Sequence, residues 1–142
     1  MLGSTSPELA NVRGARWNPP GTSALYTSLA EATAKAEGDH LIAMQPVPPR
    51  APRTIYELEI AVTNLLDLTD AARLAAIGIA EGDLDSIPWE PCQRVGGAVA
   101  WLGHDGMLIP SVRGSGGSNL VIFTANQPAN AAIIVRGSHG IG

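Results

Sequence analysis

The chain has 142 residues, 45% of them hydrophobic and 15% charged, which is typical of one globular domain and argues against disorder. The net charge of −4 and the scattered basic residues disfavour direct nucleic-acid binding, which depends on clustered Lys and Arg. No apolar run approaches the ~18 residues of a membrane span, no signal peptide is recognisable, and the lone Cys92 excludes an internal disulfide, so we expect a cytoplasmic protein.

The first part of the chain is predicted to be a lead-in, a loop, a strand and a helix. We expect residues 1–12 to be flexible and residues 13–23 (RGARWNPPGTS) to form a Gly- and Pro-rich loop. A short strand is predicted over residues 24–27. The helix that follows is predicted to begin at Ser28, which fits a capping box with Glu31, and to end near Gly38, a common C-terminal cap.

Two strands are predicted next, at residues 41–44 and 54–62, joined by an extended connection over residues 46–53. The second is the clearest strand in the chain because apolar and acidic side chains alternate along it. We expect Tyr56, Leu58, Ile60 and Val62 on one face and Glu57 and Glu59 on the other. A polar outer face is typical of an antiparallel, half-solvated strand.

The second half is predicted to contain two helices and three strands. The helices are expected over residues 70–77 and from Pro91 to Gly103, with an acidic loop at residues 81–86 between them. The strands are expected over residues 107–110, 119–124 and 131–136. The sequence therefore predicts an α+β domain over residues 13–142, with a mixed, mostly antiparallel sheet and about three short helices.

Two segments near the N-terminus contain candidate functional side chains. Arg16 and Trp17 lie in the Gly- and Pro-rich loop, where a rigid backbone would present a fixed guanidinium to a phosphate. The alternative is a solvated Arg beside a Trp that fills the edge of the core. Tyr26 ends a strand, and Glu37 is predicted in the last helical turn, where a carboxylate opposes the helix dipole. Glu37 is thus either functional or an exposed residue at a frayed helix end.

The segment after the fourth predicted strand is a further candidate. Ser111 and Arg113 would project from the same face if the strand continues past Pro110. The run from residue 113 to residue 118 (RGSGGS) resembles a phosphate-binding loop, but no helix follows it, so a flexible loop or lid is expected. Glu37, Asp39 and His40 are close together, yet they straddle the predicted helix end, so a metal site is not expected.

Taken in order, these segments resemble the RES-domain family, which is named for an Arg, a Glu and a Ser. The resemblance covers residues 13–136. The matching stretches are GARWNPPG (14–21), ALYTS (24–28), the helix with Glu37, VTNLLDLTD (62–70), QRVGGAVAWLGHDGMLIPS (93–111) and NLVIF (119–123). The ordered set of RWNPPG, YTS with Glu, and IPS followed by Asn is fairly specific.

The resemblance implies a compact variant of the ADP-ribosyltransferase fold and an NAD⁺-degrading enzyme, commonly the toxin of a toxin–antitoxin pair whose Xre-like antitoxin covers the active site. The family's Arg, Tyr, Glu and Ser correspond to Arg16, Tyr26, Glu37 and Ser111, and Asn119 matches a recurrent Asn. We expect Arg16, Glu37 and Ser111 to be catalytic. The expected substrate-binding residues are Tyr26, Asn119, Arg113 and Trp17.

Several alternatives stay open from the sequence. NAD⁺ is the expected substrate rather than a resident cofactor, and the acceptor is either water, which makes a glycohydrolase, or inorganic phosphate, which makes a phosphorylase. Arg13 or Arg113 would supply the second anion site that phosphorolysis needs. Two other functions also stay open. The chain is either a degenerate RES domain that binds a nucleotide or a partner, or a protein ADP-ribosyltransferase. Self-association is a further expectation.

Overall fold

The computed structural model describes residues 9–47, 52–85, 89–113, 116–131 and 133–141, and it confirms the predicted α+β class with three α-helices among these residues. The elements in chain order are β1 (Ala24–Ser28), α1 (Glu31–Ala43), β2 (Arg53–Ile60), β3 (Leu65–Asp67), α2 (Ala71–Ala76), the 3₁₀ turn η2 (Glu81–Leu84), α3 (Glu90–Trp101), β4 (Gly106–Pro110), β5 (Ser118–Phe123), the 3₁₀ turn η3 (Thr124–Asn126) and β6 (Ile133–Ile141). None of the helices in the described ranges is long and apolar enough to cross a membrane.

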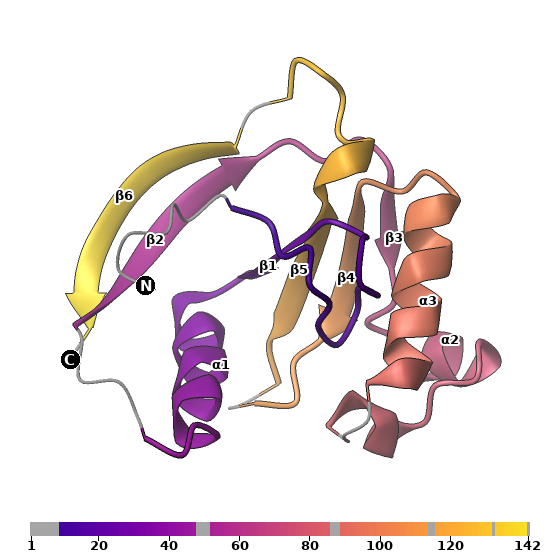
Figure 1. Cartoon of the computed structure of the whole chain (residues 1–142), viewed down its shortest axis with the longest axis horizontal. Helices are drawn as coiled ribbons and strands as arrows, with labels where there is room; N and C mark the ends of the chain where they lie inside the picture. The colour runs from indigo at the N-terminus through magenta and orange to yellow at the C-terminus, as the bar shows by residue number, and fades with distance from the viewer. Residues whose placement is uncertain (1–8, 48–51, 86–88, 114–115, 132, 142) are drawn as a thin grey trace.

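The strands form two sheets. Four strands pair in the order β1-β5-β4-β3, with β3 parallel to β4 and the other pairs antiparallel. The strands β2 and β6 form a separate antiparallel ribbon. Figure 1 shows this ribbon arching along one side of the molecule, α1 below the gap between the two sheets, and α2 and α3 on the opposite side. The expected mixed, mostly antiparallel pairing is therefore confirmed.

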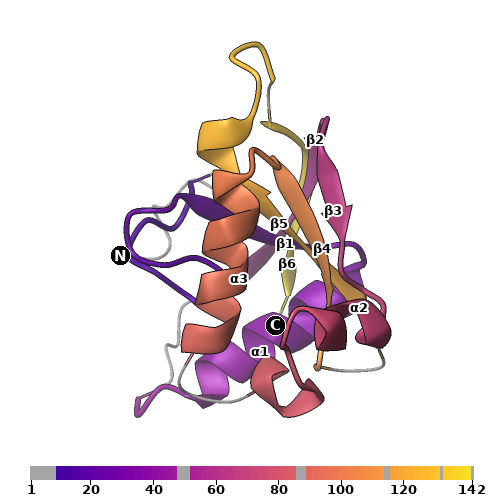
Figure 2. The ribbon, with the colours of Figure 1, turned by 90° about the vertical axis from the view of Figure 1, so that its right-hand side faces the viewer.

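The core lies between the four-stranded sheet, α3, the loop of residues 13–23 and the segment of residues 68–84 that contains α2 and η2. Figure 2 shows α3 and this loop on the same face of the sheet. The buried residues of α3 are Cys92, Gly96 and Val99, whereas Leu102 at the end of the helix is 64% exposed. Trp17 and Phe123 are almost fully buried, so two of the few aromatic side chains of the chain belong to the core.

The helix α1 differs most from its prediction. It begins at Glu31 rather than Ser28, because Ser28 continues β1 and its hydroxyl donates to Asn119 Oδ1 instead of capping the helix. The helix also continues through Gly38 to Ala43, so the predicted strand over residues 41–44 is wrong. Leu41, Ile42 and Ala43 are compatible with a helix, and Gly38 has no positive φ that would end it.

Other boundaries differ because of local pairing. The three-residue strand β3 was not predicted; it is held by parallel pairing with β4, which leaves no periodic signal in so short a segment. Two strands were predicted between the first two helices, and two are present. The observed pair is β2 and β3, however, and not the predicted pair at residues 41–44 and 54–62. In β2, a bulge between Glu57 and Leu58 changes the face, and Tyr56 is exposed while Ile55 is half-buried.

The predicted loops are also partly revised. The acidic segment from residue 81 contains η2 and is an ordered 3₁₀ turn up to Asp85, while residue 86 lies outside the described residues. Residues 48–51 of the predicted extended connection, 114–115 of the Gly/Ser loop and 1–8 of the lead-in also lie outside them. Within the lead-in, Asn11 pairs with Ala24 of β1 through two backbone hydrogen bonds of 2.7 and 2.9 Å.

Candidate active site

The loop that carries Arg16 is held in shape by two polar side chains. Asn18, which is fully buried, donates from Nδ2 to the carbonyl of Thr22 at 2.8 Å and to that of Asn11 at 3.2 Å. The hydroxyl of Tyr26 accepts from the backbone N–H of Trp17 at 2.9 Å and donates to Asn18 Oδ1. Burial raises the pKa of Tyr26, so its hydroxyl keeps the proton that this bond requires. Tyr26 of β1 therefore fixes the loop that carries Arg16 through Trp17 and Asn18.

The helix α3 supports the same loop from the other side. Gln93 Nε2 donates to the carbonyl of Ala15 at 2.9 Å. One turn further along, a Cβ at Gly96 would lie 1.6 Å from the carbonyl oxygen of Trp17, so only glycine permits this close approach. The Trp17 side chain is 2% exposed and packs in the core. Arg16 is thus presented from a backbone that is fixed on both sides.

Two arginines from distant parts of the chain bind the turn that ends η2. Arg16 NH1 donates to the carbonyl of Asp83 at 3.0 Å, and Arg113 NH1 forms an ion pair of 2.6 Å with Asp85 Oδ1. The thiol of Cys92 donates weakly to the same Asp83 carbonyl at 3.5 Å, which attaches the turn to α3. Burial raises the pKa of Cys92 although Arg16 lies nearby, so the thiol stays protonated, and Cys92 belongs to the core.

Glu37 lies in the middle of α1 and is held by two neutral donors. Ser111 Oγ and Asn119 Nδ2 both donate to its Oε2, each at 2.6 Å. No hydrogen bond from the described residues reaches Oε1. Ser28 Oγ donates to Asn119 Oδ1 at 2.7 Å, which orients the Asn119 amide so that its nitrogen faces Glu37. The carboxylate is therefore fixed through one oxygen and has the other available for a ligand.

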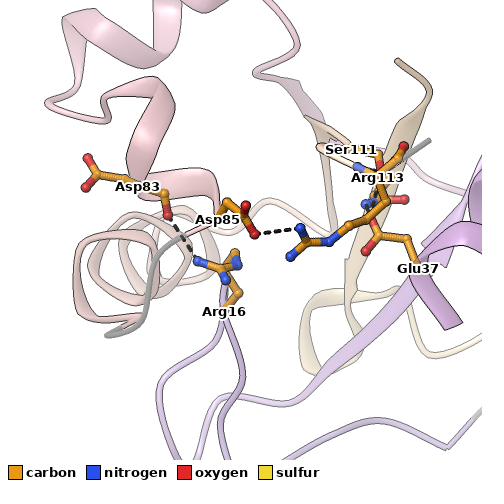
Figure 3. A network of polar contacts seen from close by, with 7 residues as sticks. Arg16, Glu37, Asp83, Asp85, Ser111 and Arg113 are labelled. Carbon is orange, nitrogen blue, oxygen red and sulfur yellow. Dashed lines mark hydrogen bonds and ion pairs between the residues drawn. The ribbon is translucent and has the colours of Figure 1, made fainter. Parts of the chain in front are cut away.

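The β4–β5 connection is drawn onto α1 beside Glu37. A Cβ at Gly117 would lie 2.0 Å from Thr33 Oγ1, so the loop backbone touches α1 one turn before Glu37. Ser111 N donates to the carbonyl of Gly117 at 2.8 Å, and Arg113 N donates to Ser111 Oγ at 3.2 Å. These bonds orient the Ser111 hydroxyl toward Glu37 and direct the Arg113 side chain toward Asp85, as Figure 3 shows.

The predicted site residues are therefore connected by contacts. Figure 3 shows Arg16, the η2 turn, Arg113, Ser111 and Glu37 in one neighbourhood. The contacts run from Arg16 to Asp83, from Asp85 to Arg113, and through Ser111 to Glu37.

Two details differ from the sequence-based expectations. Glu37 is not in the last turn of its helix, so the argument from an unfavourable helix dipole was wrong. Trp17 is a core residue, which corresponds to the alternative interpretation of this segment.

The sequence reasoning missed several residues that build the site. Asn18 and Gln93 lie inside the quoted stretches RWNPPG and QRVGG, but no role was derived for them. Ser28 was interpreted as a helix cap, and Asp83 and Asp85 as parts of an acidic loop. A cavity of about 630 Å³ lies between the start of α1 and the β2–β6 ribbon; Ser28 lines it, whereas Arg16, Glu37 and Ser111 do not. Among the described residues, no group of three side chains is placed to hold a metal ion.

Comparison with known proteins identifies relatives of this chain. A solved structure, the crystal structure of the M. tuberculosis MbcT–MbcA toxin–antitoxin complex, superposes with a TM-score of 0.83 over 97% of this chain and 79% of that chain, at 23% identity, and so shares the fold. The NAD(+) phosphorylase MbcT of Mycobacterium tuberculosis (strain ATCC 25618 / H37Rv) is 33% identical over 129 residues, which cover 86% of this chain and 67% of that protein. The same protein of Mycobacterium bovis gives the same values. The model of the RES domain matches residues 3–140, and the chain belongs to the RES domain family.

Proposed function

We propose that this protein degrades NAD⁺ by cleaving the bond between nicotinamide and ribose, with inorganic phosphate as the acceptor. The observation that carries the proposal is Glu37, whose Oε2 is held by Ser111 and Asn119 while Oε1 has no hydrogen bond from the described residues. The RES relative with 33% identity is named as an NAD(+) phosphorylase, which supports phosphate as the acceptor.

The chemistry requires only one well-placed carboxylate. Nicotinamide leaves as a neutral molecule because the C1″–N bond breaks with its electron pair going to the cationic pyridinium nitrogen. No general acid is needed, in contrast to ordinary glycoside hydrolysis. The negative charge of Glu37 would stabilise the cationic ribosyl group as it forms, and Ser111 and Asn119 would hold that carboxylate in place.

The acceptor step completes the balance of atoms. An oxygen of inorganic phosphate forms the new bond to C1″, which gives ADP-ribose-1″-phosphate and nicotinamide. Arg16 and Arg113 would bind phosphates through their guanidinium groups, a role that is supported by their contacts with the η2 turn beside the Glu37 network. Tyr26 would act by fixing the Arg16 loop, and Trp17 by packing beneath it. Asn119 would act through the carboxylate of Glu37.

The decisive experiment measures loss of NAD⁺ and release of nicotinamide by the purified protein, with and without phosphate. We expect Glu37→Gln to lower kcat by about 10²–10³-fold, the usual cost of removing one electrostatic stabiliser of a transition state. Glu57→Gln, which neutralises an exposed glutamate of β2, is the matched control and should match wild type. Equal activity of Glu37→Gln and wild type would refute the proposal.

Product analysis separates the acceptors and the competing functions. Mass spectrometry should find ADP-ribose-1″-phosphate when phosphate is present. Free ADP-ribose formed at the same rate without phosphate would instead identify a glycohydrolase. Labelled protein targets would identify a protein ADP-ribosyltransferase, and tight NAD⁺ binding without turnover would identify a binding module.

We also propose that the protein is the cytoplasmic toxin of a toxin–antitoxin pair. The structural neighbour with a TM-score of 0.83 was solved as a toxin–antitoxin complex, and the partner expected here is an Xre-like antitoxin that covers the active site. Expression of the chain alone should arrest growth while cellular NAD⁺ falls, and Glu37→Gln should do neither. Arrest by both forms would show that toxicity does not depend on NAD⁺ cleavage.

A further inference from the structure

The Arg113 guanidinium is held in an unusual setting for a charged group near a surface. Its side chain is only 16% exposed, and one strong contact is its ion pair of 2.6 Å with Asp85. Its Nε lies buried with no hydrogen-bond partner among the described residues. A guanidinium carries five N–H donors, so the Asp85 carboxylate oxygen leaves this donor unused. Burying such a donor costs free energy unless a ligand accepts from it.

The position of Asp85 connects this arginine with Arg16. Asp83 and Asp85 are two residues apart, so their Cα atoms are at most about 7 Å from each other. Arg16 binds at the first position through the Asp83 carbonyl and Arg113 at the second through the Asp85 carboxylate. The η2 turn therefore holds both guanidinium groups in one neighbourhood (Figure 3).

The two partners of the ion pair, Asp85 and Arg113, differ in how easily each can leave it for water. The Asp85 side chain is 58% exposed, so it can leave for water at little cost, whereas Arg113 is largely buried and stays. Inorganic phosphate carries more negative charge than a carboxylate, and each phosphate of the NAD⁺ pyrophosphate carries the same single charge. Inorganic phosphate and the pyrophosphate both have more acceptor oxygens than a carboxylate, which suits a guanidinium with unused donors. Exchange of the Asp85 carboxylate for a phosphate would keep the charge of Arg113 compensated and supply an acceptor for its Nε.

We infer that Arg113, together with Arg16, forms a phosphate subsite in which Asp85 is a built-in competing anion that the substrate phosphate displaces. The inference rests on the proposed NAD⁺-cleaving function and assigns its phosphate-binding chemistry. The phosphate comes either from the pyrophosphate of NAD⁺ or from the inorganic acceptor. Removing the competitor should consequently tighten binding of whichever phosphate uses the subsite, which is the opposite of what loss of a substrate ligand does.

The test compares Asp85→Asn with Glu81→Gln, which removes the same charge from the same turn at an exposed residue outside the arginine contacts. KM is measured for NAD⁺ at saturating phosphate and for phosphate at saturating NAD⁺. We expect Asp85→Asn to lower one KM about fivefold, the upper range for a partly exposed ion pair. Arg113→Gln should raise the same KM at least about tenfold, and Glu81→Gln should change neither.

The KM that moves identifies the phosphate: that of NAD⁺ indicates the dinucleotide, and that of phosphate indicates the acceptor. The inference is overturned if Asp85→Asn leaves both values unchanged or raises them, or if Glu81→Gln reproduces its effect, which would indicate a general effect of charge. Thermal melting of each variant establishes that it is folded.

A binding measurement keeps the test independent of turnover. Inorganic phosphate and ADP are titrated calorimetrically into Glu37→Gln protein with and without Asp85→Asn. We expect one of these anions to bind about fivefold more tightly to the double variant. Equal affinity of both proteins for both anions would refute the subsite even if NAD⁺ cleavage is confirmed. Absence of NAD⁺ cleavage by wild type would refute the proposed function while this titration still decides the subsite.

Discussion

Substitution of Gly96 by Ala tests whether α3 holds the Arg16 loop in place. In an ordinary helix this change raises stability by about 1 kcal/mol, because Ala has a higher helix propensity than Gly. At Gly96 the added Cβ would lie 1.6 Å from the carbonyl oxygen of Trp17 and 2.7 Å from its carbonyl carbon. An ordinary contact between carbon and oxygen is about 3.3 Å, so the loop backbone must retreat by roughly 1.5 Å or more.

The loop cannot make this movement cheaply. The Trp17 side chain is 2% exposed in the core, and the Trp17 N–H is bonded to Tyr26. Overpacking of this kind costs about 1–3 kcal/mol, and with backbone atoms involved we expect the upper end. After the helix gain is subtracted, the free energy of unfolding should fall by about 2 kcal/mol, which corresponds to roughly 4–8 °C in Tm for a domain of this size.

The same movement should impair catalysis, because Arg16 directly precedes Trp17. Misplacement of a substrate-positioning group by about 1 Å can cost on the order of 10²-fold in rate, so Gly96→Ala should lose most NAD⁺ cleavage below its melting temperature. Gly97→Ala is the matched control, since its Cβ would meet only the edge of the Pro19 ring at 3.2 Å. If Gly96→Ala raises Tm as Gly97→Ala does and keeps its activity, then α3 does not constrain the loop as described.

Two further predictions concern polar groups that organise the fold around the site. Tyr26→Phe removes the hydroxyl that accepts from Trp17 N and donates to Asn18. We expect the free energy of unfolding, measured with urea, to fall by about 1–3 kcal/mol and kcat for NAD⁺ cleavage to fall as well. Unchanged values of both would show that the loop does not depend on this hydroxyl. Asp105 is 1% exposed; burial alone would raise its pKa, but its hydrogen bonds, led by that from Thr63 N, outweigh this and hold the pKa below the ordinary value of 3.8. The contribution of the Asp105 carboxylate to stability is therefore complete above the pKa that this group has in the unfolded chain, and it is lost as the pH falls through the lower pKa of the folded protein. The midpoint of urea unfolding should consequently drop below about pH 4. Asp105→Asn should be less stable than wild type at neutral pH, and its stability should depend less steeply on pH in the acid range. An equally steep acid dependence in that variant would assign the effect to other carboxylates.

Features that depend on local chemistry could be predicted from the sequence. As predicted, Pro91 lies in the first turn of α3 and Gly103 follows that helix with a φ of 94°. The helix predicted from residue 70 is α2, although Asp70 is its N-cap and accepts a hydrogen bond from Ala72 N rather than lying inside it. In each case a short-range preference and the tertiary structure agree. The prediction at Ser28 failed because a distant partner competes with the local cap: its hydroxyl bonds Asn119, 91 residues away.

The site itself is assembled almost wholly by such distant contacts, which periodicity cannot report. Glu37 meets Ser111 and Asn119 across 74 and 82 residues, and Arg16 meets the η2 turn across 67. What linked these positions beforehand was the ordered resemblance to RES domains, and the structure explains why the quoted stretches are longer than the set of groups able to touch a substrate. In RWNPPG, Arg16 faces the η2 turn, while Trp17 and Asn18 are buried supports. In QRVGG, Gln93 and Gly96 hold that loop from α3. The two stretches together therefore contain the charged group, Arg16, and the residues that immobilise it. A substitution of one of the supporting residues should reduce activity by displacing Arg16.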